Sequence, residues 1–225
     1  MSRVHDMGGR FGDGAVPYDA DEPVFKEDWH ARALAVTLAA GALGQWNLDM
    51  SRHSRECLSP KDYARFSYYE KWMSALANML VKKGVVSTEE LRAGQGHGTS
   101  ELAERVFRAE NVAAALAKGG PADRPSDITA QFTVGQRVRT RRKAMNAIVD
   151  GGHTRLPSYA AGAVGHIVRL HGSHVFPDSN AHGLGEAAEP LYGVMFKASE
   201  LWAHPEHPGD EVLLDLWQRY LEPEP

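Results

Sequence analysis

Hydrophobic residues recur every three or four positions through the first half of the chain. In the segment 25–40 they are Phe25, Trp29, Ala33, Val36 and Ala40, and Gly41 and Gly44 follow it. This spacing places one apolar stripe on a helix, and the glycines are suited to its end. The residues 48–58 and 101–118 are also compatible with helices, although the second of these is only weakly amphipathic.

A second strong helical signal begins at Ser59. Ser59 can cap a helix, Pro60 suits the first turn, and Asp62 completes a capping pattern. The apolar stripe that follows runs to Lys82 and Gly84 and consists of Tyr63, Phe66, Tyr69, Met73, Leu76 and Leu80. These signals predict one continuous helix from residue 60 to about residue 82. Ser87 and Glu90 indicate another short helix.

The period changes from 3.6 to 2 beyond residue 130. Short alternating runs lie near residues 132–141, 164–170, 192–197 and 211–220, separated by Gly, Pro, Asp and Asn. Such runs are typical of an antiparallel sheet or a small barrel. The segments 93–100 and 119–130 are rich in Gly, Pro and small polar residues, which is typical of linkers. The pattern therefore predicts an α+β fold with a helical domain at 25–130 and a β domain at 131–225.

The first 24 residues show neither period. They contain several glycines and two prolines, together with the apolar residues Val4, Met7, Phe11, Val16 and Tyr18. A disordered tail and an extended arm on a partner are both compatible with this pattern. No stretch approaches the ~20 apolar residues that a membrane helix needs, and the start lacks the order of a signal peptide. We expect no membrane contact and a cytoplasmic protein.

Charge and cysteine content limit the chemistry. The formal net charge is −4, and the 11 histidines accompany a single cysteine, Cys57. An acidic chain has no global attraction to nucleic acid, although Arg137, Arg139 and Arg141 would share one face of a strand. One cysteine cannot build a thiolate metal site, so if the chain works at such a site, a partner chain must supply the thiolates. His166, His171, His174, His182, Asp178 and Glu186 could ligate zinc, but their spacing matches no closed site.

Two arginines and an aromatic group are candidates for a functional site. Arg52 precedes the aromatic helix, and Arg155 lies in a loop between expected strands. Each alone is compatible with a surface position, but guanidinium groups also hydrogen-bond oxyanions through two donors. Tyr68, Tyr69 and Trp72 form a dense aromatic group, for which ordinary packing is the simpler interpretation.

Taken in order along the chain, these segments resemble the beta subunit of nitrile hydratase. The matching stretches are HDMGG at 5–9, DEPVFKEDW at 21–29, LDMSRHSRE at 48–56, SYYEKW at 67–72, LVKKGVVSTEEL at 80–91, FTVGQRVRTR at 132–141, GHTRLPSY at 152–159, FPDSNAHGLGE at 176–186, SELW at 199–202 and the terminal DLWQRYLEP. The resemblance implies an N-terminal arm at 1–24 that wraps a partner, a helical domain, and an SH3-like β-barrel. The implied reaction is hydration of a nitrile to a primary amide.

The resemblance also implies how the work is divided between two chains. A separate alpha subunit would hold non-corrin cobalt or non-haem iron through cysteines, two of them oxidised, and this chain would hold no metal. Arg52 and Arg155 would hydrogen-bond the oxidised sulfurs, and Tyr68 would orient substrate or water. Leu48, Ser51, Tyr69 and Trp72 would line the substrate pocket. The expected assembly is an alpha–beta heterodimer or an alpha2beta2 heterotetramer.

Two departures from the family pattern matter for these expectations. Ser51 stands where many members carry Phe, which favours a roomier or more polar pocket, and Lys71 stands where cobalt-type members often carry His. SYYEKW and FTVGQRVR favour the iron type and FPDSNAHGLGE the cobalt type; we expect cobalt. The alternatives are a subunit similar to thiocyanate hydrolase, or a non-catalytic barrel protein that binds nucleic acid through residues 137–143.

Overall fold

The computed structural model describes residues 4–6 and 18–225. Most of the expected N-terminal arm, including its glycines and the HDMGG stretch beyond Asp6, lies outside these ranges. In the described part of the arm, the His5 ring contacts the Tyr63 ring edge-on, with 6.3 Å between centroids. Residues 18–24 are exposed. No described helix is long and apolar enough to cross a membrane.

The chain divides into two compact units at Gly120 and Pro121. The sequence placed this boundary about ten residues later, and hydrogen bonds explain the difference. The backbone N–H of Arg124 donates to Ser173 and that of Val175 donates to Ala122, while the Arg124 guanidinium binds both carboxylate oxygens of Glu186 at 2.8 and 2.9 Å. These bonds make residues 121–130 part of the second unit, despite a composition typical of linkers.

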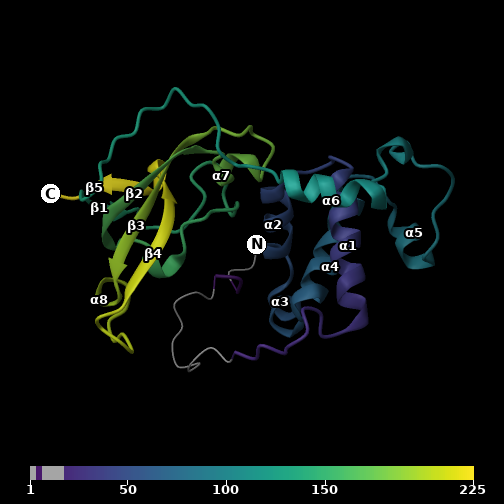
Figure 1. The fold of residues 1–225 in the computed structure, drawn as a ribbon, viewed down its shortest axis with the longest axis horizontal. Coiled ribbons are helices and arrows are strands. Elements are labelled where there is room, and N and C mark those ends of the chain that lie inside the picture. Colours follow the sequence, from purple (N-terminus) through teal and green to yellow (C-terminus); the bar gives the residue numbers. More distant parts are fainter. Residues whose placement is uncertain (1–3, 7–17) are drawn as a thin grey trace. The chain divides into compact units, whose positions relative to one another are not determined.

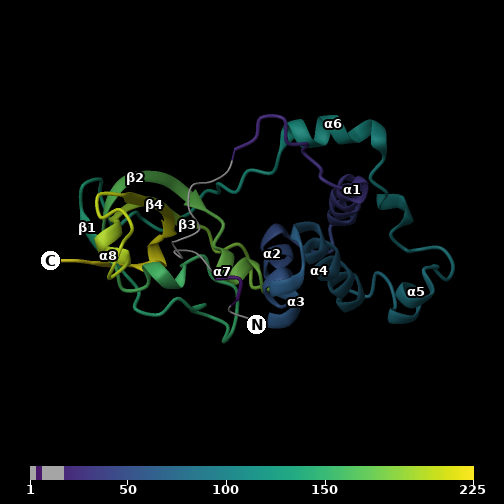
Figure 2. The same cartoon turned by 90° about the horizontal axis from the view of Figure 1, so that it is seen from below.

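The first unit is helical. Its elements are α1 (Asp28–Ala42), α2 (Leu48–Glu56), α3 (Pro60–Arg65), α4 (Tyr68–Lys82), α5 (Thr88–Ala93), the 3-10 turn η1 (Ala103–Arg105) and α6 (Ala109–Lys118). Figures 1 and 2 show α4 beside both α1 and α2, and α4 packs against each of them. The small core contains Ala40, Leu76 and Met79, with Trp46, Met73 and Leu80 packed against it.

The continuous helix expected from Pro60 to Lys82 is in fact two helices. Phe66 has an extended backbone with ψ 137° and closes α3. Ser67 then begins α4, and its backbone N–H donates to the Glu70 carboxylate at 2.7 Å. The Ser67 and Glu70 pair is itself a helix start signal, and it overrides the apolar stripe that runs through both helices. The break fixes the position from which Tyr68 and Trp72 project.

The second unit contains a five-stranded antiparallel sheet with the order β4-β3-β2-β1-β5. Its strands are β1 (Arg137–Thr140), β2 (Val164–His174), β3 (Glu189–Lys197), β4 (Glu211–Trp217) and β5 (Leu221–Pro223); the short helices are η2 (Ser158–Ala160), α7 (Pro177–Asn180), α8 (Ala198–Leu201) and η3 (Gln218–Tyr220). In the described chain the sheet ends at β4 and β5 and is not closed. The α+β class is confirmed, but the SH3-like barrel is not.

The sheet is curved (Figure 1), and the core of the second unit includes residues of its strands. Val138, Ile167, Val194 and Phe196 are fully or almost fully buried, because alternate residues along each strand point to the same face. Tyr192 and Tyr220 are also buried in this core, and each carries a hydroxyl group that requires hydrogen-bond partners. The loop between β1 and β2 contains Arg155, and the Tyr220 hydroxyl forms a hydrogen bond with the backbone of that loop.

Candidate functional site

Helix α2 carries three of the residues expected to form the site. Asn47 caps it, accepting a hydrogen bond from the Met50 backbone N–H at 2.9 Å. Ser51 is buried, and Arg52 lies beside it with about 41% of its side chain exposed. Arg52 Nη1 donates to Asp49 Oδ1 at 3.0 Å, and this bond holds the guanidinium in place. It forms no other side-chain hydrogen bond with a described residue, so its remaining donors are open to an external acceptor.

Helix α4 supplies the aromatic part of the site. The Tyr68 and Trp72 rings, one helical turn apart, lie 5.4 Å from each other, and the Tyr68 and Tyr69 rings lie 5.2 Å apart. Tyr68 is 64% exposed, so its hydroxyl is accessible, whereas Tyr69 is half-buried and also contacts the rings of Trp29 and His30. Tyr69 therefore packs toward α1 while Tyr68 faces outward.

Arg55 joins the two helices, and no sequence signal had singled it out. Its guanidinium carbon lies 4.2 Å from the centre of the Trp72 ring, and its Nη1 donates to the backbone oxygen of Ser51 at 3.1 Å. Ser51 and Trp72 therefore meet through Arg55. The spacing of Arg55 from Ser51 and Arg52 by four and three residues would have placed it on the same helical face. Leu48, at the start of α2, is 61% exposed and is not held in this cluster by any described contact.

Arg155 lies in the second unit, with an exposed side chain and a tightly held backbone. Its backbone N–H donates to the Tyr220 hydroxyl at 3.1 Å, and the Thr154 hydroxyl donates to the same oxygen at 3.3 Å. The Tyr220 hydroxyl donates in turn to the buried carboxylate of Asp178. Burial raises the pKa of Asp178, and burial together with the Asp178 charge raises the pKa of Tyr220 well above its ordinary value. The phenol therefore remains a donor throughout the neutral range.

A polar network extends from Asp178 along the same loop. The Asn146 amide donates to the backbone oxygens of His153 and Asp178, and the His153 N–H donates to His182 Nε2 at 3.0 Å. Gly152 lies within it, and a Cβ at Gly152 would lie 2.7 Å from His182 Nε2 and 2.8 Å from Asn146 Nδ2. Only glycine fits without a shift. The network thus fixes the backbone from which Arg155 projects.

Several of the other polar side chains of this region have partners of their own. His171 Nε2 lies 2.9 Å from Asp215 Oδ1, and Glu186 is engaged by Arg124. Asp178 and His182 belong to the network around Gly152. These bonds account for His171, Asp178, His182 and Glu186 of the window at 166–186, whereas His174 Nδ1 is buried with no hydrogen-bond partner in the described chain.

The basic run at residues 137–143 is partly neutralised. Arg139 donates to both carboxylate oxygens of Glu224 at 2.8 Å and to the backbone oxygen of Gly162 at 2.9 Å. Strand β1 ends at Thr140, so Arg141 is not on the strand face with Arg137 and Arg139. Three aligned guanidinium groups, as a phosphate-binding face would require, are not formed.

Cys57, at the end of α2, is exposed and lies beside a histidine. Its Sγ is 3.5 Å from His53 Nε2, and His53 Nδ1 is 3.2 Å from Glu56 Oε2. The bonds to Cys57 and Glu56 raise the pKa of His53 to about 9. The bond to His53 lowers the pKa of the Cys57 thiol. One thiolate is still far from the set of soft ligands that holds a low-spin iron or cobalt ion.

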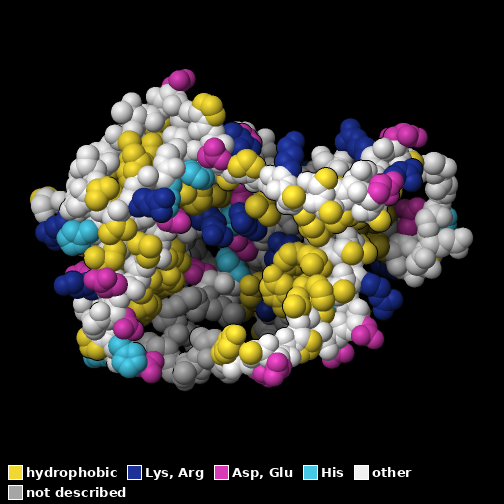
Figure 3. Space-filling view, viewed as in Figure 1, with side chains coloured by type: hydrophobic (Ala, Val, Ile, Leu, Met, Phe, Trp, Pro, Cys, Tyr) yellow, Lys and Arg dark blue, Asp and Glu magenta, His cyan; other side chains and the backbone are white. Residues whose placement is uncertain are grey.

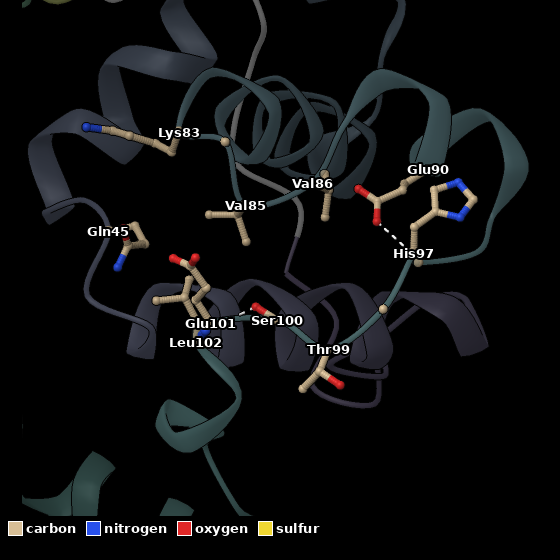
Figure 4. Close-up of a pocket in the computed structure, with 13 residues that line it drawn as sticks. Gln45, Lys83, Val85, Val86, Glu90, His97, Thr99, Ser100, Glu101 and Leu102 are labelled. Carbon is tan, nitrogen blue, oxygen red and sulfur yellow. Dashed lines mark hydrogen bonds between the residues drawn. The ribbon is translucent and has the colours of Figure 1, made fainter.

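A separate pocket of about 410 Å³ lies at the other end of the helical unit (Figure 4). Its lining includes Lys83, Val85, Glu90, His97 and Glu101. The Glu90 carboxylate has a structural role, because it accepts hydrogen bonds from the backbone N–H groups of Ser87 and His97, each at 2.7 Å. None of the expected site residues lines this pocket.

Comparison with known proteins assigns the chain to a family. The family model described as the nitrile hydratase beta subunit, N-terminal, matches residues 1–118, and its C-terminal counterpart matches residues 121–223. The low-molecular weight cobalt-containing nitrile hydratase subunit beta of Rhodococcus rhodochrous is 37% identical over 229 residues, covering 99% of this chain and 100% of that protein. The nitrile hydratase subunit beta of Pseudomonas putida is also 37% identical, over 224 residues, with the same coverage.

The thiocyanate hydrolase alternative has weaker support. The thiocyanate hydrolase subunit alpha of Thiobacillus thioparus is 33% identical over 96 residues, which cover only 41% of this chain and 71% of that protein. The nitrile hydratase models and relatives span both units, whereas this match spans less than half of the chain. The chain therefore belongs to the nitrile hydratase beta-subunit family.

Proposed function

We propose that this chain, as the beta subunit of a nitrile hydro-lyase, forms a wall of the nitrile pocket and holds the partner's metal site through arginine donors. The observation that carries the proposal is the cluster on α2 and α4. Arg55 contacts both Ser51 and Trp72 there, and Tyr68 packs on Trp72. A small polar residue, an indole face, an exposed phenol and the guanidinium of Arg52 are suited to bind a small polar molecule.

The donor set of the chain fits a supporting role toward a metal centre. Cys57 is its single thiol, so the thiolates belong to the alpha subunit, and we take the metal to be cobalt, as the name of the Rhodococcus rhodochrous relative states for that enzyme. When bound, such an ion acts as a Lewis acid toward nitrile or water. The open donors of Arg52 and the exposed guanidinium of Arg155 suit oxidised thiolates, which accept hydrogen bonds from planar, permanently charged groups.

The pocket residues divide the remaining work. The accessible hydroxyl of Tyr68 orients the nitrile or the attacking water, and Trp72 with Tyr69 behind it supplies an apolar surface. Ser51 and Leu48 complete the lining from α2. Ser51 leaves more room than a phenylalanine would, so the pocket accepts bulkier nitriles than that of a Phe-bearing relative. Each of these roles places the chain's own side chains against substrate or water.

The helical unit of this chain also has an apolar surface to which a partner could bind. Hydrophobic side chains gather over the helical unit in Figure 3. A groove of about 380 Å³ between α1 and the segment 100–107 is lined mainly by Val36, Ala39, Leu43, Leu102, Val106 and Phe107. Exposed apolar area of this kind marks interaction surfaces. We expect the arm of residues 1–24 and such helical surfaces to bind the alpha subunit in an alpha2beta2 heterotetramer.

The proposal is tested by producing the chain alone and together with its alpha subunit. The chain alone should retain no stoichiometric cobalt or iron and should hydrate no nitrile. The complex should retain the metal and hydrate nitriles. Metal analysis measures the bound ion, nitrile turnover measures the activity, and sedimentation measures assembly of the two chains. Stoichiometric metal together with nitrile hydration by the chain alone would overturn the division of roles between the two chains.

The role of Tyr68 has its own test in the assembled complex. Tyr68→Phe removes the hydroxyl and retains the ring that packs on Trp72, so kcat should fall while assembly and metal content stay normal. Tyr159→Phe is the matched control, because Tyr159 stacks on Trp202 in the second unit and its hydroxyl has no described hydrogen bond. Normal turnover in Tyr68→Phe would remove Tyr68 from the reaction.

A further inference from the structure

Arg55 is a half-buried cation with no carboxylate partner among the described residues. Five other arginines each form an ion pair with a carboxylate: Arg52 with Asp49, Arg65 with Asp62, Arg124 with Glu186, Arg139 with Glu224 and Arg219 with Glu189. Burial lowers the pKa of Arg55, the neighbouring charge of Arg52 lowers it further, and only the hydroxyls of Tyr68 and Tyr63 oppose this. A guanidinium nevertheless stays charged, so its charge lacks a counterion.

The three nitrogen atoms of this guanidinium differ in their surroundings. Nη1 donates to the backbone oxygen of Ser51. Nε is buried and has no hydrogen-bond partner in the described chain. Nη2 also has no described hydrogen bond, but it is not among the buried unpartnered atoms, so it remains accessible. The Trp72 ring covers one face of the group at 4.2 Å and thereby limits its movement.

A buried charge without a partner is costly, and an incoming oxyanion relieves that cost. The cluster of Ser51, Tyr68 and Trp72 surrounds Arg55, and these are the residues to which the proposed function assigns substrate contact. A charge-assisted hydrogen bond from Nη2 would hold a carboxylate at a fixed position on the wall of the pocket. A simple alkyl nitrile has no acceptor for this donor apart from the reacting nitrile nitrogen itself.

We infer that Arg55 is a specificity-determining residue that binds the carboxylate of nitriles carrying an anionic group. The inference rests on the proposed function, because it assigns a substrate class to the same pocket. The carboxylate binds through the accessible edge of the guanidinium, with Trp72 fixing the plane of that group. Neutral nitriles of the same length bind without this contact and are hydrated less efficiently.

The experiment uses the assembled alpha–beta complex and matched pairs of substrates. For cyanoacetate, 3-cyanopropanoate and 4-cyanobutanoate, kcat/KM is compared with that of the carboxamide of equal length, which has the same shape and no charge. The wild-type complex should prefer the carboxylate at one of these lengths. Arg55→Met should reduce that preference by about 10- to 100-fold, the range of a hydrogen bond to a charged group, because carboxylate turnover falls by that factor more than carboxamide turnover does.

Two further variants keep the result interpretable. Arg65→Met is the matched control, because Arg65 also lies over an aromatic ring, that of Phe66 at 4.6 Å, but pairs with Asp62 on the surface. It should leave the preference unchanged. Arg55→Lys retains the charge without the planar fork and should keep part of the preference, and it serves if the methionine variant does not assemble.

Several outcomes would overturn the inference. One is a wild-type complex that shows no preference for carboxylates at any length. Another is an Arg55→Met variant that slows the carboxylate and the carboxamide of each pair equally. Weakened assembly of the Arg55 variants without a carboxylate preference in the wild type would assign the counterion to the alpha subunit. If the complex hydrates no nitrile at all, the proposed function fails instead, and calorimetric titration of wild type and Arg55→Lys with butanoate then tests carboxylate binding by itself.

Discussion

The backbone N–H of Arg155 donates to the side-chain hydroxyl of Tyr220, 65 residues later in the chain, at 3.1 Å. The same hydroxyl accepts from Thr154 and donates to the buried carboxylate of Asp178. A core residue at the end of the sheet therefore holds the loop that presents an exposed arginine. This arrangement fixes the backbone from which Arg155 projects, which suits the donor role that we propose for it.

Removing the Tyr220 hydroxyl should therefore affect both stability and function. Tyr220→Phe removes the donor to Asp178 Oδ1, although the Ala147 N–H still donates to Oδ2, and it leaves the Arg155 N–H without its acceptor, so we expect a loss of about 1–3 kcal/mol in unfolding free energy. Urea unfolding measures the first effect, and nitrile turnover of the complex measures the second. Tyr159→Phe is the control. Unchanged stability and turnover in Tyr220→Phe would show that the loop is held in another way.

Gly152→Ala should disturb the same loop by steric conflict. The added Cβ would lie within 3.0 Å of His182 Nε2, Asn146 Nδ2 and the backbone oxygen of Val149. Overpacking of this kind typically costs about 1–3 kcal/mol. Gly209→Ala is the control, because nothing lies within 4 Å of the added atom there. Thermal unfolding of the two variants should differ clearly, and equal midpoints would contradict the described packing.

The protonation of His53 should depend on Cys57. Since the pKa of His53 is raised to about 9, with the Cys57 bond as the largest cause, imidazolium stabilises the fold below pH 6.5, and this contribution is lost between pH 6.5 and 9. The lowered thiol pKa of Cys57 contributes in the opposite sense, above the ordinary thiol pKa, so stability alone would mix the two. NMR titration of the His53 ring separates them: Cys57→Ala should lower its pKa, and an unchanged value would exclude the thiol as the cause.

Ser51→Phe should narrow the pocket. Ser51 is buried on α2, whose Arg55 lies over the Trp72 ring, so if Ser51 lines the pocket as proposed, a phenyl group there would take up space in it. Turnover of bulky nitriles should fall relative to small ones, by at most about 10- to 200-fold for one pocket contact. Ser54→Phe on the same helix is the control. A constant ratio of bulky to small nitrile turnover would show that Ser51 does not line the pocket.

Local signals predicted much of the helical unit, because caps and apolar spacing act over a few residues. The pattern at 48–58 became α2, and Ser87 with Glu90 began α5 as expected. The pair of Ser67 and Glu70 also indicated the break between α3 and α4. The prediction of one continuous helix followed the apolar stripe from Tyr63 to Leu80 instead. The unit boundary was misplaced because the bond between Arg124 and Glu186 joins residues far apart in the chain.

The candidate site residues came from the family resemblance, and their roles stay predictions. The resemblance proposes Arg52, Tyr68 and Trp72 through matching motifs, but it does not indicate the position of Arg55 over Trp72, which depends on how α2 packs against α4. The support of Arg155 by Tyr220, Asp178 and Asn146 depends on contacts across 30 residues or more. No local pattern distinguishes these polar residues from ordinary loop residues, which is why the histidine-rich window was weighed as a metal site.

The central claim is that Arg52 and Arg155 support the metal site of the partner subunit. It is tested most directly by measuring nitrile turnover and bound metal in assembled complexes that carry Arg52→Lys or Arg155→Lys, with Arg65→Lys as the control. A lysine keeps the charge but not the planar fork. We predict a loss of about 10- to 100-fold in activity or metal affinity for each of the two variants and none for the control. Wild-type turnover and metal content in both variants would contradict the claim and return Arg52 and Arg155 to ordinary surface arginines.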